Sequence, residues 1–305
     1  MPDKPLAEVA IDVQLVRSLV ASQTQSQIPG SATLPLRKVS EGWDNDIWKL
    51  GHHLAVRLPR RALAAPLIEH EHFALPLIAP ALNAAGLSTP LPLHRGTPSA
   101  EYPWPWSVVP WLAGSCALDQ PRSARTSWAP QLSRALVALH TTAPAQCPAN
   151  PFRGVPLTNR DDAVASRLAM LEATGTLTAR EATATKMIWQ SGRDAAQWHA
   201  APVWVHGDLH PGNLLTLNGS LHAIIDFGDV TSGDPAYDLA AAWLTFDPVG
   251  RTAFVAATNG RYDAAAWTRA RAWAVAVALM LLAHSDDNPA YARLGRASLS
   301  QALAG

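Results

Sequence analysis

The chain has 305 residues, of which 48% are hydrophobic and 16% charged, so it is long enough for two domains with hydrophobic cores and is not disordered. Lysine plus arginine and aspartate plus glutamate balance at 24 each, which provides no overall basic field for nucleic acid or an anionic membrane. The N-terminal segment lacks the apolar core of a signal peptide, and the longest apolar run, Ala272–Ala283, is about half a membrane span. Cys116 and Cys147, the only cysteines, lack metal-site spacing and are expected to be buried free thiols. We therefore expect a cytoplasmic protein that binds neither nucleic acid nor membrane.

The first third of the chain predicts a small antiparallel sheet flanked by helices. Residues 4–20 have apolar side chains at helical spacing, and so do residues 66–82 after a pair of arginines. Between them, short alternating runs are separated by turn residues, which indicates strands over 34–40, 47–50 and 53–58. The turn-rich segment Gly42–Asp46 is expected to form the loop between the first two strands.

The rest of the chain is mainly helical in its periodicity. Amphipathic or apolar spacing predicts helices over 127–140, 161–173, 178–199, 235–246, 263–284 and 291–304. Asp234 is the candidate N-cap of the fourth of these helices. No repeat, heptad pattern or low-complexity tail interrupts this part of the chain.

One polar stretch interrupts the helical pattern and brings three side chains together. The β-branched run Val203–Val205 predicts a buried strand, and the glycines and proline of His206–Asn213 predict a loop. Asn218-Gly219 is a strong hairpin signal, and the return strand Leu221–Ile225 ends at Asp226. The hairpin therefore returns Asp226 to the loop that carries Asp208 and Asn213.

Those three residue types suit phosphoryl transfer. A carboxylate at Asp208 can position and deprotonate a substrate hydroxyl. The oxygens of Asn213 and Asp226 are hard ligands of the kind that Mg²⁺ prefers, and Mg²⁺ bridges nucleotide phosphates in kinases. The sequence thus predicts Asp208 as the catalytic residue and Asn213 and Asp226 as metal ligands.

The motifs His206-Gly207-Asp208-Leu209-His210-Pro211-Gly212-Asn213 and Ile225-Asp226-Phe227-Gly228 resemble the aminoglycoside phosphotransferase family, small-molecule kinases related to choline kinase. The segment 234–239 also fits, and there the resemblance implies that Asp238 accepts hydrogen bonds from the catalytic-loop backbone. It implies an α+β, bilobal protein kinase-like fold, with a nucleotide-binding lobe and hinge over 1–112 and a catalytic, substrate-binding lobe over 113–305. ATP or GTP, Mg²⁺ and a small-molecule hydroxyl acceptor are the implied ligands of a monomer or homodimer.

The same resemblance assigns the nucleotide side of the site. Gly42, Trp43, Asp44 and Asn45 would cover the phosphates, although this loop lacks the three glycines of protein kinases. Arg57 stands where kinases usually carry a lysine, and an arginine can clamp phosphate oxygens with two hydrogen bonds. Glu71 is its expected partner, with Glu69 the weaker candidate. The Pro110 carbonyl and the Leu112 amide would read the base, and Trp111 is expected to pack.

Alternatives exist for both the reaction and the acceptor. His206-x-Asp208-x-His210 has the alternate spacing of a zinc or iron hydrolase site, although Pro211-Gly212 argues for a loop. An aminoglycoside antibiotic is the first acceptor implied; a metabolic amino alcohol, sugar or homoserine-like compound is the second. A pseudokinase that only senses nucleotide is a third reading. The acidic residues that a cationic acceptor would need are sought among Asp161, Asp162, Glu172, Glu181 and Asp194.

Overall fold

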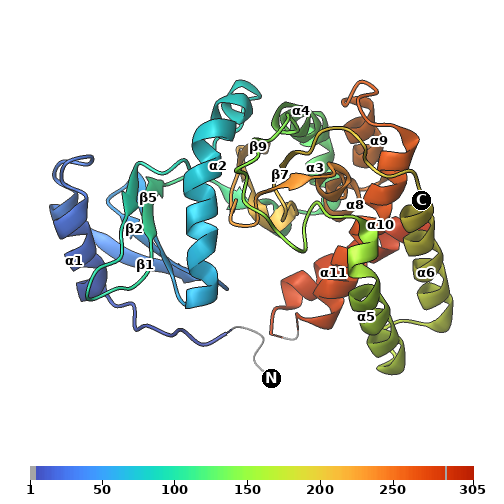
Figure 1. Ribbon diagram of the computed structural model, residues 1–305, viewed down its shortest axis with the longest axis horizontal. Coiled ribbons are helices and arrows are strands. Elements are labelled where there is room, and N and C mark those ends of the chain that lie inside the picture. Colours follow the sequence, from blue (N-terminus) through green and yellow to red (C-terminus); the bar gives the residue numbers. More distant parts are fainter. Residues whose placement is uncertain (1–4, 286) are drawn as a thin grey trace.

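The computed structural model describes residues 5–285 and 287–305 and has two lobes (Figure 1). The N-terminal lobe contains an antiparallel sheet, and the larger C-terminal lobe is mainly helical. This arrangement confirms the bilobal α+β, protein kinase-like architecture. The proposed boundary at residue 112 stays a prediction; the strands of the first sheet lie before it, and those of the two smaller sheets lie after it.

The N-terminal sheet has the strand order β1-β2-β3-β5-β4, with every neighbouring pair antiparallel. Val56 and Leu58 of the third strand point into a core that also contains Val16, Leu19 and Val20. Because side chains alternate along a strand, Arg57 points to the opposite face, toward the other lobe. The elements are α1 Val13–Gln23, β1 Leu36–Glu41, β2 Asn45–Leu50, β3 Leu54–Pro59, β4 His94–Gly96 and β5 Trp106–Pro110.

The first helix begins later than expected, so the prediction of a helix over 4–20 was wrong in its first half. It begins at Val13 because the Asp12 carboxylate accepts hydrogen bonds from the backbone amides of Gln14 and Leu15, at 3.0 and 2.8 Å. The preceding segment is not helical, and the Glu8 amide donates to the Arg60 carbonyl at 2.8 Å. Residue 4 lies outside the described residues.

The long helix α2, Ala65–Ala84, lies between the sheet and the C-terminal lobe (Figure 1). Its buried face includes Ile68, Glu71, Leu75, Ile78 and Leu82, which recur at intervals of three and four residues. The last three of these belong to the core of the C-terminal lobe. The helix therefore holds Glu71 at the junction of the two lobes.

The C-terminal lobe is built around α10, Ala264–Ala283, which is long and apolar enough to cross a membrane by length and composition alone. Its most apolar window is 67% buried inside the lobe, as in a core helix of a soluble protein. The other elements are β6 Ser115–Cys116, α3 Arg122–Arg125, α4 Ala129–Leu139, α5 Asp161–Ala173, α6 Ala179–Asp194, β7 Val203–Val205, β8 Leu214–Leu217, β9 Ser220–Ile224, β10 Thr231–Gly233, α7 Ala236–Leu239, α8 Ala241–Thr245, α9 Pro248–Ala256 and α11 Pro289–Ala304.

Two predicted helices differ from the observed ones. The helix expected over 178–199 ends at Asp194, where the next residue, Ala195, is extended, and the carbonyl of Ala196 accepts a hydrogen bond from Arg269. The helix expected over 235–246 is divided into α7 and α8. Pro235 occupies its N-cap position, while Asp234 accepts from the Ala236 amide at 3.0 Å and pairs with Arg269.

His72 on α2 makes the stability of the protein depend on pH. Its ring nitrogen Nε2 lies 2.7 Å from the Ser107 hydroxyl, and burial, helped by the charges of Arg95 and Arg57, lowers the pKa of His72 to about 4. The unfolded chain takes up this proton near pH 6.5, so we expect the free energy of unfolding to fall as pH drops from 6.5 to 4. After discounting for partial exposure the loss is about 2 kcal/mol. Urea unfolding of wild type and His72→Gln across this range tests it; identical pH dependence would contradict the assignment.

Candidate active site

The loop that carries Asp208 follows β7 and is packed against the Asp-Phe-Gly segment. Gly207 has a φ of 85°, and a Cβ at this position would lie 2.2 Å from the Asp229 carbonyl oxygen, so only glycine fits. His206 joins the two segments, because its Nε2 donates to the Ile225 carbonyl at 3.1 Å and its Nδ1 accepts from the Asp208 amide at 3.1 Å. The hairpin β8–β9 therefore returns the chain to the catalytic loop, as the sequence predicts.

The same contacts argue against a zinc or iron hydrolase. Both ring nitrogens of His206 are engaged with the backbone, and Nδ1 of His210 accepts from the Gly212 amide at 3.0 Å. Within residues 5–285 and 287–305, no group of three histidine, cysteine, aspartate or glutamate side chains is arranged to hold a metal ion. The two histidines at this alternate spacing thus make hydrogen bonds with the backbone of the loop and of Ile225.

Asp208 is held in one orientation by its neighbours. Asn213 donates from Nδ2 to the Asp208 backbone carbonyl at 2.8 Å and to its carboxylate at 2.9 Å, and Nε2 of His210 lies 3.4 Å from the same carboxylate oxygen. Burial raises the pKa of the Asp208 carboxyl, but His210 and the positive charge of Arg153 outweigh burial and hold that pKa well below its usual range. Asp208 is therefore ionised at neutral pH and able to accept a hydrogen bond from a hydroxyl group.

Asp226 lies across from this loop at the end of β9 and has a positive φ of 64°, an uncommon conformation for aspartate. Its side chain is 54% exposed and its Oδ1 lies 3.7 Å from Nη2 of Arg57. Loss of solvation in the cleft raises the pKa of Asp226 to about 7; the negative charges of Glu71 and Asp208 add to this effect, and Arg57 opposes it. Such a concentration of negative charge is favourable for a divalent cation.

Arg57 and Glu71 form a buried ion pair, as predicted. Glu71 is fully buried, and its second carboxylate oxygen accepts a hydrogen bond from the Phe227 amide at 3.0 Å. One glutamate thus connects β3 of the small lobe with the Asp-Phe-Gly segment of the large lobe. Glu69 makes neither contact.

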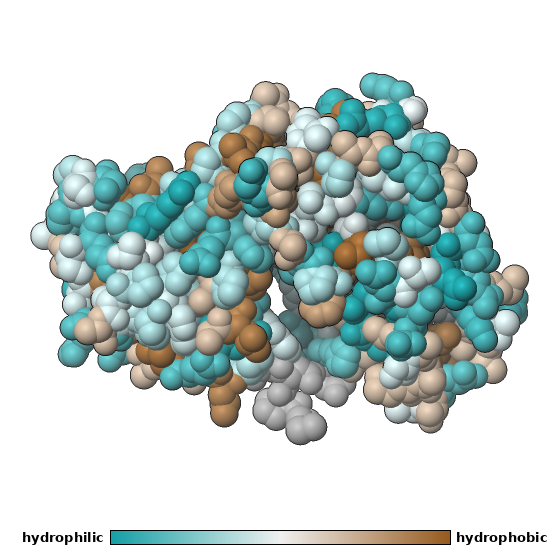
Figure 2. Space-filling view, viewed as in Figure 1, coloured by the Kyte–Doolittle hydropathy of each residue, from teal (hydrophilic) through white to brown (hydrophobic). Residues whose placement is uncertain are grey.

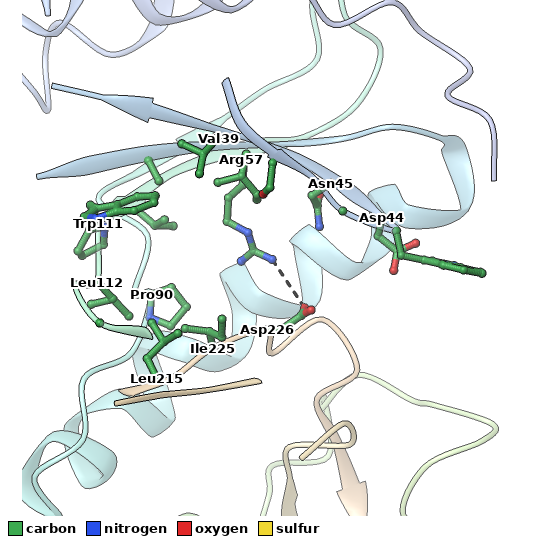
Figure 3. Close-up of a pocket in the computed structure, with 18 residues that line it drawn as sticks. Val39, Asp44, Asn45, Arg57, Pro90, Trp111, Leu112, Leu215, Ile225 and Asp226 are labelled. Carbon is green, nitrogen blue, oxygen red and sulfur yellow. Dashed lines mark ion pairs between the residues drawn. The ribbon is translucent and has the colours of Figure 1, made fainter. Parts of the chain in front are cut away.

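The pocket between the lobes has a volume of about 380 Å³ and contains most of the residues expected to bind nucleotide. Its lining includes Gly42, Trp43, Asp44, Asn45, Arg57, Pro110, Leu112 and Asp226. Figure 3 shows Trp111, Leu112 and Pro90 at one end and Asn45, Arg57 and Asp226 toward the other. An apolar end beside a charged end suits a base attached to a polyphosphate.

The connecting segment at the apolar end presents backbone groups to this pocket. The Trp111 amide donates to the His53 carbonyl at 2.7 Å, so Pro110 and Leu54 face each other as a pair without hydrogen bonds. The Pro110 carbonyl therefore points away from β3. Recognition of the base by this carbonyl and the Leu112 amide stays a prediction.

Several residues near the site were missed or misjudged from the sequence. Trp111 was expected only to pack, yet it lines the pocket, with Nζ of Lys49 4.5 Å from its ring centroid. Arg153 was not singled out, although its charge acts on Asp208 and its Nη2 lies 3.4 Å from Asp229. Asp229 directly follows Asp-Phe-Gly, which was the one available signal for this pair.

Asp238 supports the catalytic loop from below, as the resemblance implied. This fully buried carboxylate accepts from the amides of His206 and Gly207 at 2.7 and 3.1 Å and lies 3.2 Å from Nε2 of His140. We expect Asp238→Ala to lower the free energy of unfolding by about 3 kcal/mol and to reduce kcat, because buried donors lose their acceptor. Urea unfolding measures the loss, with the exposed Glu172→Ala as a control expected to stay within about 0.5 kcal/mol of wild type.

The sheet-containing lobe, the cleft and the two acidic motifs together define a phosphotransferase with the protein kinase-like fold. The chain belongs to the phosphotransferase enzyme family, whose sequence model matches residues 35–273. A search of the curated proteins found no match to this sequence.

Solved structures with the same fold include aminoglycoside and macrolide phosphotransferases. The GDP and kanamycin complex of APH(2″)-IIIa is 20% identical, with a TM-score of 0.64, over 93% of this chain and 98% of that one. The macrolide 2′-phosphotransferase MphH from Brachybacterium faecium is 21% identical, with a TM-score of 0.61, over 94% and 97%. The streptomycin and ATP complex of APH(2″)-IIa is 18% identical, with a TM-score of 0.56, over 96% and 97%. At these identities the likeness extends to the fold alone.

Proposed function

We propose that this phosphotransferase moves the γ-phosphoryl group of ATP or GTP to a hydroxyl group of a small molecule. The observation that carries the proposal is that Arg57 and Asp226 line a pocket between the lobes, while Asp208 and Asn213 lie in the adjacent loop, which is hydrogen-bonded to Ile225. The similar structures include complexes with GDP and with ATP, which supports nucleotide binding but not the choice between the two.

The residues on both sides of the cleft fit a nucleotide bound with Mg²⁺. The Asp226 carboxylate and the Asn213 side-chain carbonyl would hold the ion, because the Asn213 amide nitrogen is already directed at Asp208. Bound Mg²⁺ would neutralise charge on the phosphates during transfer. Arg57, fixed by Glu71, would contact phosphate oxygens, and the loop 42–45 would cover them.

Asp208 would orient the acceptor hydroxyl. The oxygen of the acceptor hydroxyl forms a bond to the γ-phosphorus, while the bond between that phosphorus and the β,γ-bridging oxygen breaks. The hydroxyl proton passes to Asp208 and then to solvent. The depressed pKa of Asp208 makes it a weak base, which suits a loose transition state in which the hydroxyl is positioned more than deprotonated. Positioning and charge neutralisation then supply most of the rate enhancement.

Two acceptors follow from the sequence, and the structure bears on them differently. An aminoglycoside is supported by similar structures that are complexes with kanamycin, gentamicin and streptomycin. A cationic acceptor needs carboxylates, however, and Asp161 is engaged with Trp189 and Arg193 while Glu181 caps α6 and pairs with Arg296. These contacts engage two of the five candidate carboxylates, and Asp162, Glu172 and Asp194 are exposed. The loss of two carboxylates favours the second candidate, a metabolic hydroxyl compound, over a polycation.

A transfer assay tests the proposal and the pseudokinase alternative together. Release of nucleoside diphosphate, and phosphate on the acceptor, would be followed with a panel of aminoglycosides, macrolides, sugars, amino alcohols and hydroxy acids. We expect transfer to at least one class, its loss on chelation of Mg²⁺ and its recovery when Mg²⁺ is restored. Nucleotide binding without transfer to any member would instead support a sensor.

A further inference from the structure

Apart from the effect of Arg153 on the pKa of Asp208, three neighbouring arginines have no part in the mechanism above. They are Arg153 in the loop between α4 and α5, Arg160 immediately before α5 and Arg167 within it. In the space-filling view the surface is hollowed between the two lobes (Figure 2). The question is what these cations are placed to bind.

Arg153 is built into the site by its own loop. Asn150 donates to the Asp229 carboxylate at 2.8 Å, and the Gly154 carbonyl accepts from the Asp234 amide at 3.0 Å, which fixes the loop on both sides of Arg153. The guanidinium lies 5.5 Å from the Tyr237 ring centroid, and its Nε is buried without a hydrogen-bond partner. Asp229 and the Tyr237 ring thus hold the guanidinium in place.

Arg160 and Arg167 extend the positive charge from Arg153. Arg160 immediately precedes α5, Arg167 lies in its second turn, and the charge of Arg160 acts on Arg167. Arg160 is 4.8 Å from the Phe152 ring centroid, and Nε of Arg167 lies 3.4 Å from Nε2 of His284. Burial lowers the pKa of both arginines, and the positive charge of Arg153 lowers it further, so the three share one neighbourhood.

Asp229 and Asp208 act electrostatically on Arg153, whereas no described carboxylate is among the groups that act on Arg160 or Arg167. In the described part of the chain, Asp229 is the one carboxylate that forms an ion pair with these arginines, and it lies 3.4 Å from Arg153. Asp161, adjacent to Arg160 in sequence, is turned to Arg193 and Trp189. The positive charge of these three arginines would repel a polycationic acceptor and attract an anion.

We infer that the acceptor carries an anionic group, a carboxylate or a phosphate, which Arg160 and Arg167 bind together with Arg153 while the hydroxyl faces Asp208. This inference rests on the proposed function and names the class of its substrate. Guanidinium groups suit such an anion, since each can donate two parallel hydrogen bonds to it.

Calorimetry with the nucleotide pocket saturated by MgADP tests the inference without knowledge of the natural acceptor. The probes are inorganic phosphate, gluconate as a hydroxy carboxylate, glucose as its neutral counterpart and kanamycin as a polycation. We expect phosphate and gluconate to bind more tightly than glucose or kanamycin, and at least about tenfold more weakly in Arg160→Gln/Arg167→Gln. The matched control Arg180→Gln removes a charge from the exposed face of α6 and should bind anions as wild type does.

Tighter binding of kanamycin, no anion binding at millimolar concentration, or anion binding unchanged in the double variant would each overturn the inference. Gluconate binding without phosphate binding identifies a carboxylate acceptor, and the reverse identifies a phosphate. Turnover is measured separately on gluconate against glucose and glycerate against glycerol. If no hydroxyl compound is phosphorylated, the proposed function fails, while the calorimetric comparison still decides the charge preference of the cleft.

Discussion

Replacement of Asp208 by asparagine is expected to reduce phosphoryl transfer by about 10²- to 10⁴-fold, the range for loss of a positioned general base. Asparagine keeps the shape of the side chain, so the contact with Asn213 is largely preserved. It lacks the negative charge that would receive the hydroxyl proton in the proposed mechanism and that His210 and Arg153 face. Single-turnover measurement of phosphate on the acceptor reports this loss directly.

Nucleotide affinity separates a catalytic effect of Asp208→Asn from a general one. The residue does not line the nucleotide pocket, so the dissociation constant of MgADP should stay within about threefold of wild type. The exposed Asp194→Asn on α6 makes the same change of charge away from the cleft and should retain full activity. Turnover of Asp208→Asn at the wild-type rate would remove this residue from the mechanism.

Loss of Glu71 is expected to have the second large effect. Glu71→Ala leaves Arg57 buried without its counterion and the Phe227 amide without its acceptor, so the free energy of unfolding should fall by about 3–5 kcal/mol. Arg57 would also lose its fixed direction toward the phosphates, and the KM for nucleotide should rise. Urea unfolding and initial-rate kinetics measure the two consequences.

Paired substitutions distinguish the structural from the functional part of this ion pair. The double variant Arg57→Met/Glu71→Met removes both charges at once and should recover most of the lost stability while staying inactive. Arg57→Lys keeps the charge that kinases usually carry here but loses the planar fork, so partial activity is expected. Wild-type stability of Glu71→Ala, or activity in the double variant, would contradict the roles given to these residues.

Much of the site was predictable because its parts are close in sequence. Asp208, Asn213 and Asp226 lie within one strand-loop-hairpin unit, whose turn residues fix where the chain reverses. The pairing of Arg57 with Glu71 was predictable from the resemblance, and so was the support that Asp238 gives the loop. Their chemical roles stay predictions.

Other features depended on contacts that no local pattern contains. The predicted start of α1 was wrong because the apolar spacing also continues on the N-terminal side of Asp12, whose carboxylate caps the helix. The end of α6 is set by Arg269, a residue of another helix. Trp111 lines the pocket because the Pro110 segment pairs with β3, which its own neighbours in sequence do not reveal.

The amino-acid sequence alone determined the reaction class, because the carboxylates and the amide it requires are placed by short-range turns and strands. Only the tertiary structure decided what surrounds the acceptor. There, Arg153, Arg167 and Asp229 come from three separate segments, and two of the acidic residues considered for a cationic substrate, Asp161 and Glu181, are turned to other partners. The electrostatic potential at a site depends on all the charged groups near it in space, and the packing of distant segments decides which groups those are.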